Sequence, residues 1–89
     1  MSSSINWRLK VRNKVYKEAS KFPVQEYKRI LVAIERLLVN PYVGDIEKMK
    51  GETQTWRKRI GNYRIFYEII SKEKTIYVFH IERRTSNTY

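Results

Sequence analysis

Hydrophobic and polar residues alternate in several segments of the chain, and this period of two is typical of β-strands with one buried face. The N-terminal segment, residues 5–11, alternates Ile, Trp, Leu and Val with polar residues. Three further segments alternate in the second half of the chain, at residues 56–60, 63–69 and 75–83. Gly61-Asn62 separates the first two of these by a two-residue turn, so we expect them to form a β-hairpin.

Between these segments the hydrophobic spacing changes to that of helices. One apolar stripe lies at i, i+3, i+4, i+7 and i+8: Ile30, Ala33, Ile34, Leu37 and Leu38. We expect this helix to begin after Pro23 and to end at Asn40-Pro41. A shorter helix is expected over residues 13–21, with Asn13 as a candidate N-cap.

The order of these elements is β-α-α-β-β-β, with a loop expected over residues 41–55. This order predicts an α+β fold, in which a helical hairpin packs on one face of an antiparallel sheet. The length of 89 residues suits a single domain spanning residues 1–89.

The composition is strongly basic. Nineteen Lys and Arg stand against nine Asp and Glu, giving a formal charge of +10. Such a charge favours an anionic partner: nucleic acid, an acidic protein or an anionic membrane surface. The chain has no Cys and one His, so we expect no disulfide, no thiolate nucleophile, no metal and no cofactor. No apolar run is long enough to span a membrane and no signal peptide is recognisable, so we expect a cytoplasmic protein.

The basic residues gather on one face of the predicted hairpin. If Trp56 and Ile60 point to the helices, then Arg57 and Arg59 point to the opposite, open face, and Arg64 and Phe66 of the next strand share it. Guanidinium groups bind phosphate in a bidentate manner and stay charged at physiological pH. Phe66 offers a ring for base stacking. These residues indicate a nucleic-acid site, the alternative being an ordinary solvated face. Lys58 falls on the side expected to be core, where its chain could reach past an edge.

Residues 48–68 resemble the core signature of the RelE/ParE superfamily of toxins. The stretch Trp56-Arg-Lys-Arg-Ile-Gly-Asn-Tyr-Arg-Ile-Phe-Tyr-Glu68 carries a Gly-Asn turn between two arginine-bearing strands, and Lys50-Gly51 precedes it. Glu82-Arg83-Arg84 and the late Tyr89 also fit the resemblance. The β-α-α-β-β-β order is the fold of that superfamily, and the resemblance covers nearly the whole chain.

The resemblance implies the toxin of a type II toxin–antitoxin system, neutralised by an acidic antitoxin. RelE-like members are metal-independent endoribonucleases that cut mRNA on the ribosome, whereas ParE-like members inhibit DNA gyrase. Carried over by position, the resemblance implies catalytic roles for Arg57, Arg59, Arg64, Arg83 and Tyr89. Lys48, Lys50, Phe66 and Arg84 are expected to contact RNA.

Several residues are candidates for the general base, because a guanidinium has no neutral form near pH 7. Glu47 matches the approximate position of a catalytic Glu in some members of the superfamily. Lys48, Lys50 and Tyr89 are alternatives. On the expected strand 75–83, alternation puts His80 on the same side as Glu82 and on the opposite side from Arg83. We therefore expect His80 to be structural or exposed rather than catalytic.

Three rivals to the ribosome-dependent nuclease stay open. The first is a gyrase inhibitor without chemistry, which would not need the arginines and Tyr89 together. The second is a basic RNA-binding module, whose binding would fall steeply with salt. The third is a toxin that has lost its activity. We expect an acidic chain to bind the arginine face and the helical hairpin.

Overall fold

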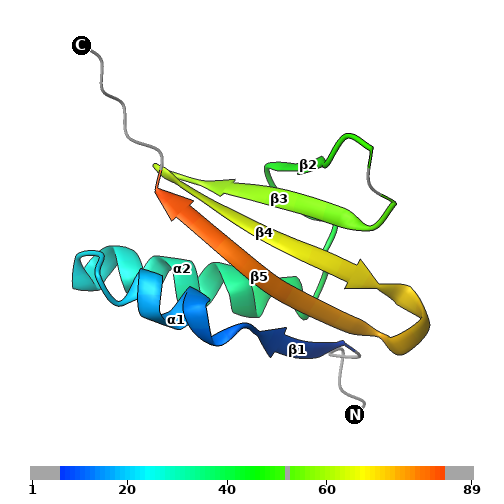
Figure 1. The fold of residues 1–89 in the computed structure, drawn as a ribbon, viewed down its shortest axis with the longest axis horizontal. Helices are drawn as coiled ribbons and strands as arrows, with labels where there is room; N and C mark the ends of the chain where they lie inside the picture. Colours follow the sequence, from blue (N-terminus) through cyan, green and yellow to red (C-terminus); the bar gives the residue numbers. More distant parts are fainter. Residues whose placement is uncertain (1–6, 52, 84–89) are drawn as a thin grey trace.

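The computed structural model describes residues 7–51 and 53–83, which form a five-stranded sheet and two α-helices. In chain order the elements are β1 (Arg8–Val11), α1 (Asn13–Ala19), α2 (Val24–Leu37), β2 (Ile46–Lys48), β3 (Thr55–Ile60), β4 (Tyr63–Ile70), the 3₁₀ turn η1 (Ser71–Glu73) and β5 (Thr75–Arg83). Both helices lie on one face of the sheet and leave the other face open (Figure 1). The expected α+β fold is therefore confirmed.

The sheet differs from the expectation in two respects. Its strand order is β1-β5-β4-β3-β2, and β1 runs parallel to β5, so the sheet is mixed rather than wholly antiparallel. A short strand, β2, also forms within the expected loop and pairs with β3. An alternating pattern identifies a strand but carries no information about the direction of its neighbour, which long-range pairing decides.

The core lies between the helices and the sheet. Its buried apolar residues come from α1, α2, β4 and β5: Val15, Ala19, Ile30, Ala33, Ile34, Leu37, Tyr63, Ile65, Tyr67, Ile69, Ile76, Val78 and Ile81. The apolar stripe of α2 is confirmed, although Leu38 is only half-buried and follows the last helical residue. The N-cap prediction was wrong: Asn13 is the first residue of α1, and Arg12 occupies the N-cap without a side-chain cap.

Four aromatic residues lie in the core or at its rim. Tyr63 and Tyr67 are buried, while Trp7 and Trp56 are half-buried against the core. The Tyr67 hydroxyl donates a hydrogen bond of 3.0 Å to the Pro41 carbonyl. Burial disfavours the phenolate and raises the pKa of Tyr67 to about 12.

Candidate active site

The β3–β4 hairpin places three arginines on the sheet face that the helices leave open. Arg59 pairs directly with Arg64, and Arg57 pairs with Phe66. Residues opposite each other in an antiparallel pair share a face, so these four side chains gather there as the sequence predicted. Gly61 permits the tight turn, because its φ of 56° is the positive value required at the first central position of a two-residue hairpin.

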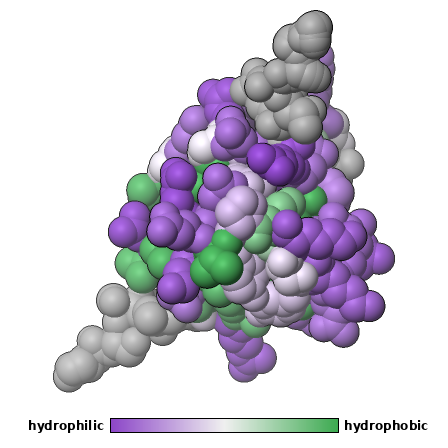
Figure 2. Space-filling view, turned by 90° about the vertical axis from the view of Figure 1, so that its left-hand side faces the viewer, coloured by the Kyte–Doolittle hydropathy of each residue, from purple (hydrophilic) through white to green (hydrophobic). Residues whose placement is uncertain are grey.

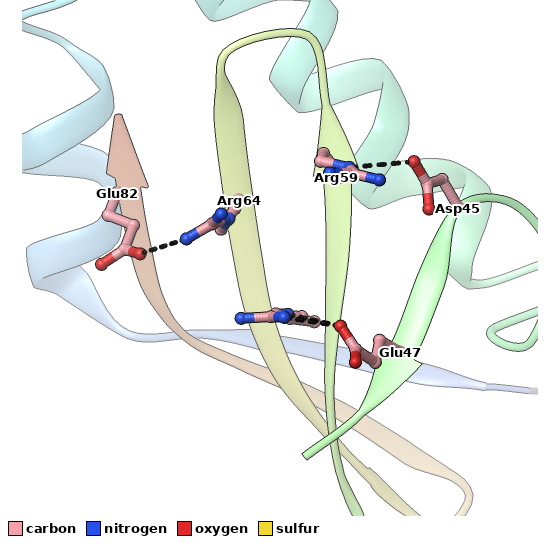
Figure 3. A network of polar contacts seen from close by, with 6 residues as sticks. Asp45, Glu47, Arg59, Arg64 and Glu82 are labelled. Atoms are coloured by element: carbon pink, nitrogen blue, oxygen red, sulfur yellow. Dashed lines mark hydrogen bonds and ion pairs between the residues drawn. The ribbon is translucent and has the colours of Figure 1, made fainter. Parts of the chain in front are cut away.

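Strand β2 and the residue before it bring two carboxylates, Glu47 and Asp45, to the same face (Figure 3). The Arg57 Nε and Nη2 atoms donate to Glu47 Oε1 at 3.1 and 2.5 Å, and Arg59 Nε donates to Asp45 Oδ2 at 3.1 Å. Each of these exposed ion pairs offsets part of the repulsion among the clustered guanidiniums, by about 0.2–1 kcal/mol.

A β-bulge in β5 decides which of its side chains reach the open face. Phe66 pairs with His80 but Tyr67 pairs with Val78, so Phe79 is left without a partner in the register. The skipped residue puts Ile81, rather than His80, opposite the buried Ile65. Burying isoleucine instead of imidazole is favourable on both apolar and polar grounds. His80 and Glu82 consequently lie on the open face.

Glu82 connects this strand to the arginines. Its two oxygens lie 3.6 Å from Arg64 Nη1 and 3.4 Å from His80 Nε2. The His80 ring also contacts the Phe66 ring, with 5.2 Å between centroids. One carboxylate thus joins Arg64 of β4 and His80 of β5, the single histidine of the chain.

The bulge also moves Arg83 away from the other arginines. Arg83 pairs with the buried Tyr63, and its guanidinium carbon lies 6.0 Å from the centroid of that ring. This is the helix side of the sheet. The structure therefore does not bring Arg83 together with the three arginines of the hairpin.

Five side chains line a small pocket, which we call the arginine pocket: Asp45, Glu47, Arg57, Arg59 and Arg64. Its volume is about 70 Å³. This is well below the roughly 300–1,000 Å³ of a pocket for a drug-sized molecule, so the space suits a small anionic group such as a phosphate. A phosphate entering the pocket would compete with the two carboxylates for the guanidinium hydrogen bonds.

The other residues predicted to contact or cleave RNA do not gather at the arginine pocket. Lys48 pairs with Trp56 and so shares the helix side of the sheet, and Lys50 is exposed in the turn after β2. Neither lines the arginine pocket. Arg84 and Tyr89 lie outside the described residues.

The sequence analysis did not identify Asp45 as a site residue. It also did not predict that Glu82 and His80 would lie next to the arginines. The alternation Asp45-Ile46-Glu47 was the available signal for Asp45, because alternate residues of one strand share a face. No comparable signal existed for His80 and Glu82, since their orientation depends on the bulge at Phe79.

Residues 7–51 and 53–83 hold no group of three or more acidic or histidine side chains placed to bind a metal ion. No helix among them is long and apolar enough to cross a membrane.

Comparison with known proteins identifies the family of this chain. The family model described as "ParE toxin of type II toxin-antitoxin system, parDE" matches residues 5–88. The chain therefore belongs to this family, and the resemblance to the RelE/ParE superfamily is confirmed. It is a toxin of a toxin–antitoxin system.

Individual relatives carry the RelE name. A protein of Methanocaldococcus jannaschii named "Putative toxin RelE1" is 28% identical over 83 residues, covering 90% of this chain and 92% of the relative. The toxin in the archaeal RelE–RelB complex of Pyrococcus horikoshii is 27% identical with a TM-score of 0.79, covering 91% of this chain and 98% of that one. The isolated Escherichia coli RelE toxin has a TM-score of 0.76 at 16% identity and covers 91% and 87%, which shows the shared fold.

Proposed function

We propose that this toxin is an endoribonuclease that cleaves mRNA on the ribosome without a metal ion. The observation that carries the proposal is the arginine pocket, in which three guanidiniums surround a phosphate-sized space beside two carboxylates. The RelE-named relatives at 27–28% identity support the nuclease branch of the superfamily.

The proposed reaction is attack by the ribose 2′-OH on the adjacent phosphorus. The bond from O2′ to phosphorus forms as the 2′-OH proton passes to a general base. The bond from phosphorus to O5′ breaks and O5′ takes up a proton from solvent water, so the products are a 2′,3′-cyclic phosphate and a 5′-hydroxyl. Negative charge grows on the phosphate oxygens in the transition state. Arg57, Arg59 and Arg64 would stabilise that charge, and donors preorganised in this way each contribute on the order of 10²–10³ in rate.

Glu47 is the proposed general base. Both hydrogen bonds from Arg57 go to its Oε1 atom. Within the described part of the chain, Oε2 receives no hydrogen bond, so this oxygen can accept the 2′-OH proton while Arg57 holds the carboxylate in place. His80 is the alternative base, because it lies on the same face and imidazole exchanges protons near neutral pH.

The ribosome would supply the substrate geometry that this small site lacks. Holding two reacting groups in line can contribute roughly 7–11 kcal/mol to a reaction, which explains how a pocket of this size could act on mRNA presented by another particle. Because ribosomes lie in the cytoplasm, this proposed role implies that the toxin acts there. We further propose that an acidic antitoxin neutralises it, since the antitoxin partner RelB is present in the solved complexes of the relatives.

The test is induced expression in a bacterial host with primer extension on a reporter mRNA. Wild-type protein should produce cuts inside translated codons, and these should disappear when translation is blocked. Arg64→Ala should abolish the cuts, whereas Arg12→Ala, an exposed arginine at the N-cap of α1, should leave them intact. Cuts that persist in Arg64→Ala would refute the proposal.

DNA gyrase inhibition is the second candidate function, because the matching family model is that of a ParE toxin. It predicts growth arrest with intact reporter mRNA and a loss of supercoiling by purified gyrase. The two functions are therefore separated by running both assays on the same preparation.

A further inference from the structure

The sheet face that carries the arginine pocket also carries a row of four rings. We call it the aromatic row, and its members in spatial order are Tyr77, Phe79, Phe66 and His80. The centroids of successive rings lie 6.2, 6.4 and 5.2 Å apart. All four residues are half-buried, so each keeps part of its surface in contact with solvent. The proposed reaction gives Tyr77 and Phe79 no role.

The β-bulge in β5 makes the row continuous. Tyr77 pairs with Glu68 of β4, and side chains paired in this way share a face of the sheet. Phe79 is the residue that this register skips, and its ring lies between those of Tyr77 and Phe66. Phe66 in turn pairs with Arg57 on β3. The row therefore leads from the arginine pocket toward the opposite edge of the sheet.

Two cations lie at the far end of the row, on β1. Lys10 pairs with Tyr77, and its Nζ lies 5.9 Å from the centroid of that ring. Arg8 is two residues earlier on the same strand and so shares this face. Both are exposed, and neither forms an ion pair with a carboxylate in residues 7–51 and 53–83. Three strand spacings separate β1 from β3, which is about 14 Å.

Rings that lie between two sets of cations suit a single-stranded nucleic acid. Each nucleotide offers a phosphate to the cations and a base whose flat face stacks on an aromatic ring. Figure 2 shows that one end of the molecule is mainly hydrophilic, with hydrophobic residues in small separate areas. That end offers no broad apolar patch of the kind that protein partners cover. These features favour RNA over a protein as the occupant of the row.

Glu68 adds a carboxylate beside the row. It is half-buried opposite Tyr77, and its side chain has no hydrogen-bond or ion-pair partner within the part of the chain that the structure describes. A carboxylate repels phosphate but accepts hydrogen bonds from the amino group of a base. Cytosine carries an amino group where uracil carries an oxygen, so Glu68 can distinguish these two bases.

We propose that the aromatic row, together with Glu68 and Lys10, is a base-selecting subsite of the RNA site. With the scissile phosphate in the arginine pocket, the base of a neighbouring nucleotide would stack on the row. Glu68 would accept a hydrogen bond from its amino group, and Lys10 and Arg8 would hold a further phosphate. The subsite would thus prefer cytosine, adenine or guanine to uracil. The inference rests on the proposed function, because it extends the RNA beyond the phosphate at which cleavage occurs.

The test uses purified full-length protein and two fluorescein-labelled oligonucleotides of equal length, one of cytidine and one of uridine. Both carry 2′-O-methyl groups, which block the attacking oxygen and prevent cleavage. Fluorescence anisotropy at low salt should show that the cytidine oligonucleotide binds more tightly by roughly fivefold or more. Both affinities should fall as salt is raised. Amide chemical-shift changes should fall on β1 and β5 as well as on the arginine pocket.

Matched variants locate the contact. Glu68→Gln should bring the two affinities within about twofold of each other, because its amide can also donate to the uracil oxygen. Tyr77→Leu, which keeps an apolar side chain in the row, and Lys10→Glu should each weaken both oligonucleotides by roughly fivefold or more. Tyr16→Leu and Lys14→Glu, at exposed positions of α1, should leave both affinities within about twofold of the wild type. Circular dichroism of each variant separates lost binding from lost folding.

Three results would overturn the proposal. They are equal wild-type affinities for the two oligonucleotides, an unchanged cytidine preference in Glu68→Gln, and shift changes confined to the arginine pocket. Saturable binding of an acidic peptide to the row, not displaced by either oligonucleotide, would also overturn it, because the surface would then belong to a protein partner. None of these measurements needs ribosomes or cleavage, so failure here is distinct from failure of the nuclease proposal.

Discussion

Glu47→Gln should change catalysis and RNA binding in opposite directions. Gln keeps the shape of the side chain and an oxygen that can accept the Arg57 hydrogen bonds of 3.1 and 2.5 Å, but it cannot take up a proton. If Glu47 is the base, the cleavage rate on ribosomes should fall by about 10²–10⁴-fold.

The affinity of Glu47→Gln for RNA should not fall along with its cleavage rate. The Glu47 side chain is 67% exposed and that of Arg57 is 34% exposed, so their ion pair contributes about 0.2–1 kcal/mol. Removing the negative charge frees Arg57 for phosphate and should strengthen binding by up to roughly fivefold. The assay is single-turnover cleavage of a reporter mRNA on stalled ribosomes, with affinity measured separately on a substrate whose scissile 2′-OH is replaced by hydrogen.

Asp45→Asn is the matched control, because Asp45 pairs with Arg59 in the same pocket without being the proposed base. Its cleavage rate should change by less than about fivefold, as expected for an exposed ion pair. A Glu47→Gln enzyme that cleaves at the wild-type rate would refute the assignment and favour His80. Equal losses in both variants would show that the pocket needs its negative charge rather than a base.

Two further predictions concern tyrosine and lysine titration. Tyr67→Phe removes the hydrogen bond to Pro41 and should lower the free energy of unfolding by about 1–2 kcal/mol at pH 7, measured by urea denaturation. In the wild type, the pKa of Tyr67 rises from 10.0 to about 12 on folding, so its contribution is complete below pH 10 and is lost as the pH rises to 12. Between pH 10 and 12 the free energy of unfolding of the variant should therefore fall by about 2–3 kcal/mol less than that of the wild type. Parallel plots of this free energy against pH would contradict the prediction. Burial and Arg36 lower the pKa of Lys58, so in proteins with ¹³C-dimethylated lysines the Lys58 signal should titrate at lower pH than the ordinary value of a dimethylated lysine side chain. The Lys58→Arg variant lacks the Lys58 signal and so assigns it. If the signal that titrates at the lowest pH is still present in this variant, that signal is not Lys58 and the prediction is wrong.

Much of the fold follows from local patterns. The alternation over residues 75–83 predicted β5 with its observed bounds, and the stripe beginning at Ile30 predicted the buried side of α2. The same local information predicted the convergence of Arg57, Arg59 and Arg64, because a two-residue turn forces its flanking strands to pair. The period of a pattern and the chemistry of a turn are properties of neighbouring residues, so the sequence by itself determined these features.

Only the tertiary structure decided how the site is completed. Pairing with β4 required one skipped residue at Phe79 so that Ile81 could meet Ile65, and this turned His80 toward the arginine face and Arg83 away from it. Pairing of β2 with β3 brought Glu47 to Arg57 across ten positions of sequence. Both outcomes arise because burial of apolar side chains selects the strand register, and register links residues whose relation no local pattern encodes.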